Sequence, residues 1–250
     1  MVARAGLAAR GVIYLLIGWV AILVALGQSG KEADQRGALQ LLASKPYGQV
    51  SLWLLCIGFA AYALWRLSEA AFGVTGDGNG AGPRLKSLGR AVIYGSLAVT
   101  TFSVINGSSR SQSGQQQDWT ARLMHHPGGR WAVGVVGAAV VIAGLILVTE
   151  GVRHKFEKYL RMQQMSRTTR RTVHWLGTIG TVARGLVLAL AGALVIEAAV
   201  QYKASKAGGL DAALHTLRNQ PFGKYLLIAA GLGLIIFGLY GLCEARWRKV

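Results

Sequence analysis

One spacing recurs three times along the chain and constrains the fold more than any other feature. An arginine begins each copy, a proline follows 36 or 37 residues later, and a glycine stands two residues after the proline. A glutamate then stands 23 residues after each proline. Self-similarity at a fixed period marks an internal repeat, so the chain is predicted to hold three copies of one unit. The repeated residues are Arg10, Arg90 and Arg184; Pro46, Pro127 and Pro221; Gly48, Gly129 and Gly223; and Glu69, Glu150 and Glu244.

Each unit contains two apolar stretches separated by a polar loop. All six approach the ~20 apolar residues that cross ~30 Å of hydrocarbon, and a composition of 52% hydrophobic and 15% charged residues is typical of membrane proteins. The 23 residues from proline to glutamate make about 34 Å of helix. Proline and glutamate are therefore predicted on opposite membrane sides, and arginine and glutamate on the same side. The stretches are roughly residues 11–27, 50–67, 91–105, 131–149, 182–200 and 225–243.

The repeats predict the domain organisation. Residues 1–72, 84–153 and 173–250 form repeats of two spans each, and residues 154–172 form a basic cytoplasmic linker. A unit with two spans keeps its orientation when it is copied, so the copies are related by an axis along the membrane normal. The predicted fold is an all-α integral membrane protein with six transmembrane helices, arranged as three two-helix repeats with pseudo-threefold symmetry about the membrane normal.

A short amphipathic helix in the membrane interface is predicted before each proline. In the first and third copies, leucines stand seven and four residues ahead of the proline, which places them on one helical face. The second copy keeps only Leu123 of this pattern. The interfacial helix is therefore expected to be weakest there.

The distribution of charge predicts the orientation. The side that carries the termini holds 17 of the 27 lysines and arginines, whereas the ten acids divide equally. The positive-inside rule then places both termini in the cytoplasm. The most basic segment, residues 151–175, is interpreted either as an ordinary positive-inside linker or as a surface that holds anionic lipid headgroups at about 1 kcal/mol per basic residue. No nucleic-acid partner is expected, because no soluble domain that could recognise nucleic acid is present.

A search for catalytic chemistry yields no enzyme signature. The five histidines fall outside the six apolar stretches, and His125 and His126 lack the spacing of a metal site. No metal, cofactor or catalytic residue is predicted, and the chain is interpreted as a non-enzyme. Glu197 is an acid within an apolar stretch and hence a candidate functional residue. It stands 13 residues beyond Arg184, about 20 Å along the helix and near the outer interface.

The repeat glutamates need a stabilising partner. Each closes its helix at the C-terminal end, where the helix dipole disfavours an acid. The repeat arginines stand 59 or 60 residues before them, on the same membrane side and beside small residues. Each arginine is therefore predicted to pair with a repeat glutamate across helices, so that three pairs clasp the cytoplasmic end of the bundle.

The three copies of small-Arg-small, Pro-x-Gly and a span that closes on glutamate resemble the bacterial membrane family called domain of unknown function 1206. The resemblance covers residues 3–248, and Gly128 departs from it, since Tyr47 and Phe222 stand at that place in the other copies. It implies a multi-pass protein of the bacterial cytoplasmic (inner) membrane and no particular activity.

Two functions remain open from the sequence. The first is a non-enzymatic membrane module, structural or accessory, that packs against another membrane protein or holds lipid. The alternative is a channel or transporter with a pathway along the pseudo-threefold axis. A pathway needs polar lining, and the few polar residues of the spans gather in the third span, so the first function is favoured.

Overall fold

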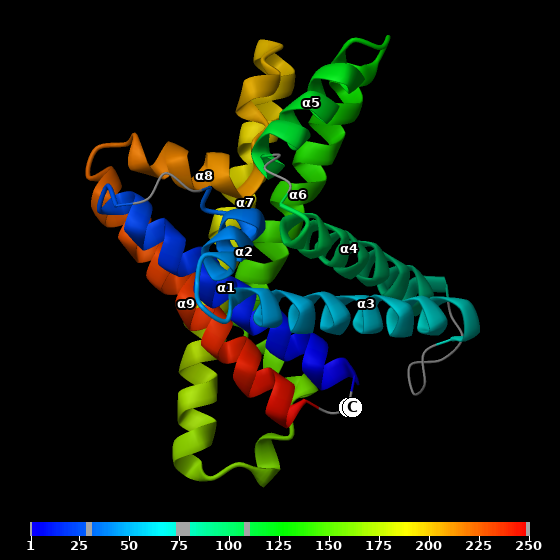
Figure 1. Ribbon diagram of the computed structural model, residues 1–250, viewed down its shortest axis with the longest axis vertical. Helices are drawn as coiled ribbons and strands as arrows, with labels where there is room; N and C mark the ends of the chain where they lie inside the picture. Colours follow the sequence, from blue (N-terminus) through cyan, green and yellow to red (C-terminus); the bar gives the residue numbers. More distant parts are fainter. Residues whose placement is uncertain (1, 29–31, 74–80, 108–110, 249–250) are drawn as a thin grey trace.

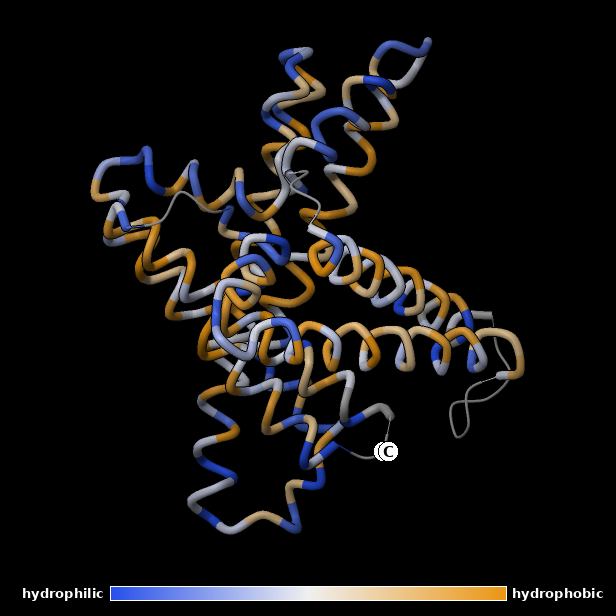
Figure 2. Tube along the Cα trace, viewed as in Figure 1, coloured by the Kyte–Doolittle hydropathy of each residue, from blue (hydrophilic) through white to orange (hydrophobic). Residues whose placement is uncertain are grey.

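The computed structural model describes residues 2–28, 32–73, 81–107 and 111–248, and within these residues the fold is all-helical (Figure 1). Each predicted apolar stretch coincides with most of a long helix, and all six of these helices are long and apolar enough to cross a membrane. Figure 2 shows apolar residues along most of their length. The long helices are α1 (Val2–Ala25), α3 (Gly48–Phe72), α4 (Ala81–Ile105), α6 (Gly129–Val152), α7 (Arg167–Gln201) and α9 (Gly223–Trp247).

A short helix precedes each repeat proline, as the leucine spacing predicts. These helices are α2 (Gln35–Ala43), α5 (Gln112–Met124) and α8 (Gly209–Arg218). The second copy also forms its helix, and α5 with 13 residues is the longest of the three. Its apolar face is the weakest, as expected, because α5 buries Ser113 and Met124 whereas α2 and α8 each bury a leucine. The Ser111 hydroxyl accepts a hydrogen bond from the Gly114 amide at 2.8 Å and caps this helix, and glutamine favours helix. Helix formation here did not require the leucine pattern.

The Pro-x-Gly motif forms a tight turn closed by the same hydrogen bond in all three repeats, although the residue after the proline has a φ of −103° at Tyr47 and a positive φ, 78° and 60°, at Gly128 and Phe222. The glycine amide donates to the carbonyl oxygen of the residue before the proline, at 2.9, 2.9 and 2.8 Å. Proline suits the second position of such a turn because its φ is already fixed. Each glycine begins the following long helix, where a Cβ would collide with a backbone carbonyl oxygen of the preceding short helix, that of Leu42, Leu123 or Arg218. Proline and glycine therefore recur for reasons of local geometry.

The long helices pair between repeats more closely than within them. The second helix of one repeat packs against the first helix of the next: α3 against α4, α6 against α7, and α9 against α1. Figure 1 shows the three pairs pointing in different directions, with α3 and α4 extending to one side. Because α9 returns to α1, the pairing links the three repeats into a closed ring.

Small residues meet at one recurring register in these pairs. In one contact, the residue directly after the repeat arginine meets the residue that stands six positions before the repeat glutamate of the partner helix. In the other contact, the residue eight positions after the arginine meets the residue 13 positions before that glutamate. In two pairs both positions are glycine, and each glycine faces the partner's backbone. In the third pair the Cys56 thiol donates to the Ala98 carbonyl oxygen at 3.6 Å. The glycine contacts are Gly11–Gly238, Gly18–Gly231, Gly185–Gly144 and Gly192–Gly137.

The apolar core forms around α1. Half of the span of α1 is buried inside the protein, against 22% for α4 and 17% for α6. Ile13, Ile17 and Val20 of α1 are fully buried or nearly so, and belong to the same core cluster as Leu194 of α7 and Leu234 of α9. The centre of the structure is therefore filled by apolar side chains.

Residues 154–172, the predicted basic linker, form a connecting segment only in part. Its first residues form two short 3₁₀ turns, η1 (Lys155–Tyr159) and η2 (Met162–Gln164), and the rest belongs to the first turns of α7. Phe156 and Leu160 are buried in a second apolar cluster with Tyr240 of α9. The linker thus folds back against the last helix and leaves its basic residues outside.

Candidate functional site

The repeat arginines lie inside their helices rather than at the start. Arg10, Arg90 and Arg184 follow the first residue of α1, α4 and α7 by 8, 9 and 17 positions, which is about 12, 14 and 26 Å of helix. The repeat glutamates lie in the last turn of α3, α6 and α9. Because each pair is antiparallel, arginines and glutamates lie at the same end of the pairs, here called the arginine side. The opposite end, with the three Pro-x-Gly turns, is called the proline side.

Glu244 joins two arginines. The Arg10 guanidinium of α1 donates to one carboxylate oxygen, and the Arg248 guanidinium donates to the other. The side chain of Glu244 is 7% exposed and that of Arg10 20%. A carboxylate this deeply buried needs charge-assisted hydrogen bonds on both oxygens, and the two arginines supply them.

Glu69 forms an ion pair within its own helix, α3. Arg66, three residues earlier on α3, donates to Glu69 at 2.5 Å, and the Ser87 hydroxyl of α4 donates to the same oxygen at 3.2 Å. Arg66 also donates twice to the Tyr62 hydroxyl, at 3.0 and 2.8 Å. Arg66 therefore takes the place on Glu69 that a repeat arginine was predicted to take.

Arg184 packs on aromatic rings instead of on a carboxylate. Its guanidinium carbon lies 5.2 Å from the Tyr14 ring centre and 4.8 Å from the Phe237 ring centre. Such cation–π contacts stabilise a cation but satisfy none of its N–H donors. Within the part of the chain that the structure describes, Arg184, Arg90 and Glu150 form no hydrogen bond or ion pair through their side chains.

The predicted clasp of three pairs is therefore present as one pair, Arg10 with Glu244. Arg66 competes successfully for Glu69 because it stands one helical turn away on the same face. Arg184 turns toward the rings on α1 and α9 instead of toward Glu150. Arg66, three residues before Glu69, stands at the spacing of a helical ion pair, but the sequence argument favoured the repeat arginines because the local bases keep no common offset in the three copies. The role of Arg248, four residues after Glu244, was missed.

Five arginines gather on the arginine side. Arg10 and Arg184 both lie over the Phe237 ring, 5.4 and 4.8 Å from its centre, and Arg66 lies over the Tyr62 ring, which is 4.3 Å from the Tyr94 ring. Arg90 is close enough to Arg66 and Arg248 for their charges to repel. Only Glu69 and Glu244 form ion pairs with this group among the described residues, so positive charge is in excess. The set comprises Arg10, Arg66, Arg90, Arg184 and Arg248 and is called the arginine cluster.

The other predicted candidates lie away from this cluster. Glu197, near the end of α7 on the proline side, accepts hydrogen bonds from Lys206 Nζ and Gln201 Nε2, both at 2.8 Å. This half-exposed carboxylate is neutralised locally, as expected of an interfacial ion pair. Among the residues that the structure describes, no three histidine, cysteine or acidic side chains come together to hold a metal.

A second group of charges joins the three short helices on the proline side. Asp34 caps α2 by accepting from the Gly37 amide at 2.9 Å, and Asp211 of α8 accepts from the Ala33 amide at 2.8 Å. Glu32 accepts from the Ser111 hydroxyl and the Gln112 amide at the start of α5. These carboxylates hold together helices from all three repeats.

Asp34 makes stability depend on pH. Burial, and then the nearby charges of Glu32 and Asp211, raise the pKa of Asp34 from 3.8 to about 7, against the opposing effect of the Gly37 amide. His215 lies 3.4 Å from Asp211, whose pKa is also raised by burial. A raised carboxyl pKa means that the folded chain binds more protons than the unfolded chain, so stability falls as pH rises from about 4 to about 7.

We expect the melting temperature of the protein in detergent to be higher near pH 5 than near pH 8, because Asp34 is protonated at the lower pH. Asp34→Asn should reduce this difference, since asparagine keeps the helix cap without titrating. Asp118→Asn, at an exposed acid of α5, is the matched control. An unchanged pH difference in Asp34→Asn would show that other groups cause it.

Three comparisons relate this chain to known proteins. The model of the family described as Domain of Unknown Function (DUF1206) matches residues 5–73, 85–154 and 179–248, and each match contains one repeat arginine, proline and glutamate. The uncharacterized protein YxxB of Bacillus subtilis is 30% identical over 250 residues, which cover 99% of this chain and 90% of that protein. No solved structure matches the chain.

Proposed function

The chain belongs to the family described as Domain of Unknown Function 1206, and we propose that it is a non-enzymatic membrane module whose arginine cluster binds the phosphate headgroups of anionic phospholipids. The observation that carries this proposal is that Arg90 and Arg184 lie in the cluster without a hydrogen-bond acceptor among the described residues. Arg184 is partly buried and Arg90 is exposed on the surface of the protein, and a guanidinium group that leaves bulk water in a membrane requires acceptors. A phosphate offers several in the geometry that arginine binds best.

The position of the cluster supports a lipid ligand. Its arginines come from α1, α3, α4 and α7 and from the residue that follows α9, and Arg66 and Arg184 lie on aromatic rings. Basic pockets between transmembrane helices on the cytoplasmic side are suited to anionic headgroups. We place the arginine side in the cytoplasm of a bacterial cell, because it holds 17 of the 27 basic residues.

We further propose that the three helix pairs form a pseudo-threefold arrangement about the membrane normal. Support comes from the small-residue contacts, which recur at the same offsets from the repeat arginine and glutamate in each pair. The arginine cluster then collects charges from all three repeats at one end. A channel along the axis would need polar lining, and the apolar core around α1 disfavours one.

Lipid binding to purified protein tests the proposal. We expect native mass spectrometry to detect bound phosphatidylglycerol in preference to phosphatidylcholine, and Arg90→Gln combined with Arg184→Gln to weaken this binding about thirtyfold. That figure takes about 1 kcal/mol for each arginine.

Arg170→Gln combined with Arg171→Gln is the matched control. It removes the same charge from exposed positions at the start of α7, outside the cluster. Equal losses in the two double variants would assign lipid binding to the general basic surface rather than to the cluster.

A further inference from the structure

The second repeat lacks a buried leucine that the other two possess. Seven residues before the repeat proline stand Leu39 on α2 and Leu214 on α8, with 0% and 1% of their surface exposed. Thr120 of α5 occupies this position in the second repeat. At the preceding position, fully buried alanines in α2 and α8 correspond to Trp119, which is 72% exposed. The second repeat therefore has less apolar volume beneath its short helix.

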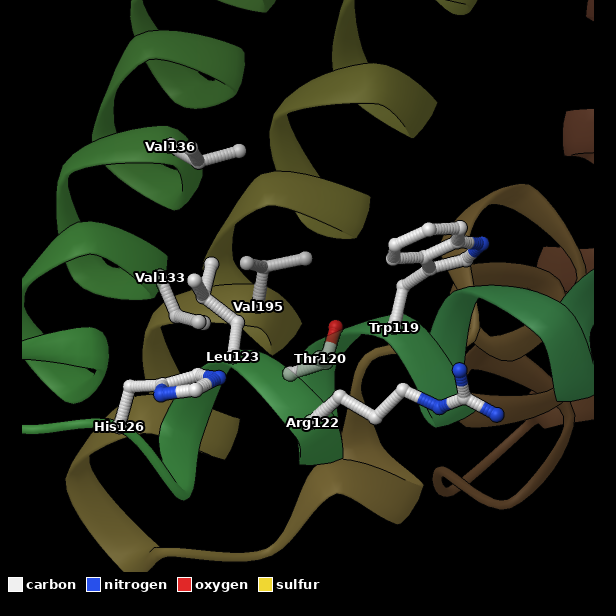
Figure 3. A pocket seen from close by; sticks show the side chains of 8 residues that line it. All are labelled: Trp119, Thr120, Arg122, Leu123, His126, Val133, Val136 and Val195. Atoms are coloured by element: carbon white, nitrogen blue, oxygen red, sulfur yellow. The ribbon is translucent and has the colours of Figure 1, made fainter.

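A pocket lies at this place. It has a volume of about 300 Å³ and lies between α5 and the long helices α6 and α7 (Figure 3). Thr120, which stands at the position of Leu39 and Leu214, is part of its lining. The lining residues are Trp119, Thr120, Arg122, Leu123, His126, Val133, Val136 and Val195.

The walls and the rim of the pocket differ in chemistry. Leu123, Val133, Val136 and Val195 form apolar walls, whereas Arg122 and Trp119 lie at one end and His126 at the other (Figure 3). Within the described part of the chain, the Arg122 side chain forms no ion pair or hydrogen bond. An apolar crevice with a cation at its rim complements an amphiphile with an anionic headgroup.

We propose that this pocket holds an acyl chain of an anionic phospholipid from the leaflet on the proline side, with the phosphate at Arg122. The acyl chain lies against the three valines and beside Thr120, whose side chain is smaller than the leucines of the other repeats. Trp119 and His126 border the headgroup region, where aromatic and polar side chains normally meet the interface. This site lies at the opposite end of the molecule from the arginine cluster and is independent of it.

Quenching of Trp119 fluorescence tests the site, because brominated acyl chains quench tryptophan on contact. The protein is reconstituted in phosphatidylcholine vesicles that contain a minor share of brominated phosphatidylglycerol or, in a parallel sample, of brominated phosphatidylcholine. The signal of Trp119 is the difference between the unmodified protein and Trp119→Phe. We expect severalfold stronger quenching of this signal by brominated phosphatidylglycerol than by brominated phosphatidylcholine.

Two variants distinguish lipid binding in this pocket from the contact that any membrane protein makes with surrounding lipid. Thr120→Leu should fill the pocket, keep or raise the melting temperature and lower the quenching by both lipids, and Arg122→Gln should abolish the preference for phosphatidylglycerol. Thr216→Leu on α8, a matched exchange outside the pocket, should change neither. Equal quenching by both lipids in the unmodified protein, or unchanged quenching in Thr120→Leu, would overturn the proposal. The double exchange of Arg90 and Arg184 should leave this signal unchanged, whichever way the test of the arginine cluster turns out.

Discussion

Gly144→Val should lower the free energy of unfolding by about 3 kcal/mol or more, because it forces a side chain into a contact between two helix backbones. A Cβ at Gly144 of α6 would lie 2.6 Å from the backbone nitrogen of Ala189 and 2.7 Å from the carbonyl oxygen of Gly185, both on α7. Backbone atoms cannot turn aside as a flexible side chain can. Thermal unfolding in detergent should show a melting temperature lower by roughly 6–12 °C.

Gly95→Val is the control for this experiment. Gly95 also lies within a long helix, α4, but a Cβ there meets no atom within 4 Å. Its melting temperature should stay within a few degrees of that of the unmodified protein. Similar losses in both variants would mean that glycine matters for the helix itself and not for close packing between repeats.

Glu244→Gln should be the most damaging exchange of a charged residue, with a loss of about 3–5 kcal/mol. The carboxylate is buried and binds Arg10 and Arg248 together, so its neutralisation leaves two guanidinium groups without their counter-charge. Denaturant unfolding in detergent measures the effect.

Glu150→Gln provides the comparison at the equivalent position of the second repeat. Glu150 forms no ion pair or hydrogen bond through its side chain among the described residues, and its exchange should change the unfolding free energy by only about 0.5 kcal/mol. Equal losses at Glu244 and Glu150 would restore the predicted clasp of three equivalent pairs and contradict the arrangement described above.

The sequence was sufficient to predict the helices and the repeats, because both depend on local features. Length and apolarity define the six long helices, and the equal spacing of arginine, proline and glutamate defines the copies. The pairing of helices between repeats was not predicted. Gly137 and Gly144 on α6, like Gly185 and Gly192 on α7, stand seven residues apart, and this shared spacing was the signal that could have revealed it.

The site was predictable only in part, because its contacts depend on tertiary structure. The spacing indicated that a repeat arginine and a repeat glutamate meet, as Arg10 and Glu244 do. It could not show that Arg184 would turn toward Tyr14 and Phe237, since these rings lie on α1 of the first repeat and on α9, far from Arg184 in the sequence. When the three repeats are aligned, Thr120 takes the position that Leu39 and Leu214 occupy in the other copies. The pocket itself depends on how α5 lies on α6 and α7.

The most direct test of the proposed function is a cryo-electron microscopy map of the protein in nanodiscs of phosphatidylglycerol and phosphatidylcholine. We expect headgroup density within about 3 Å of the guanidinium groups of Arg90 and Arg184, together with a dry apolar core around α1. A continuous file of ordered waters through the centre, with no headgroup density at either arginine, would contradict the proposal and favour a channel.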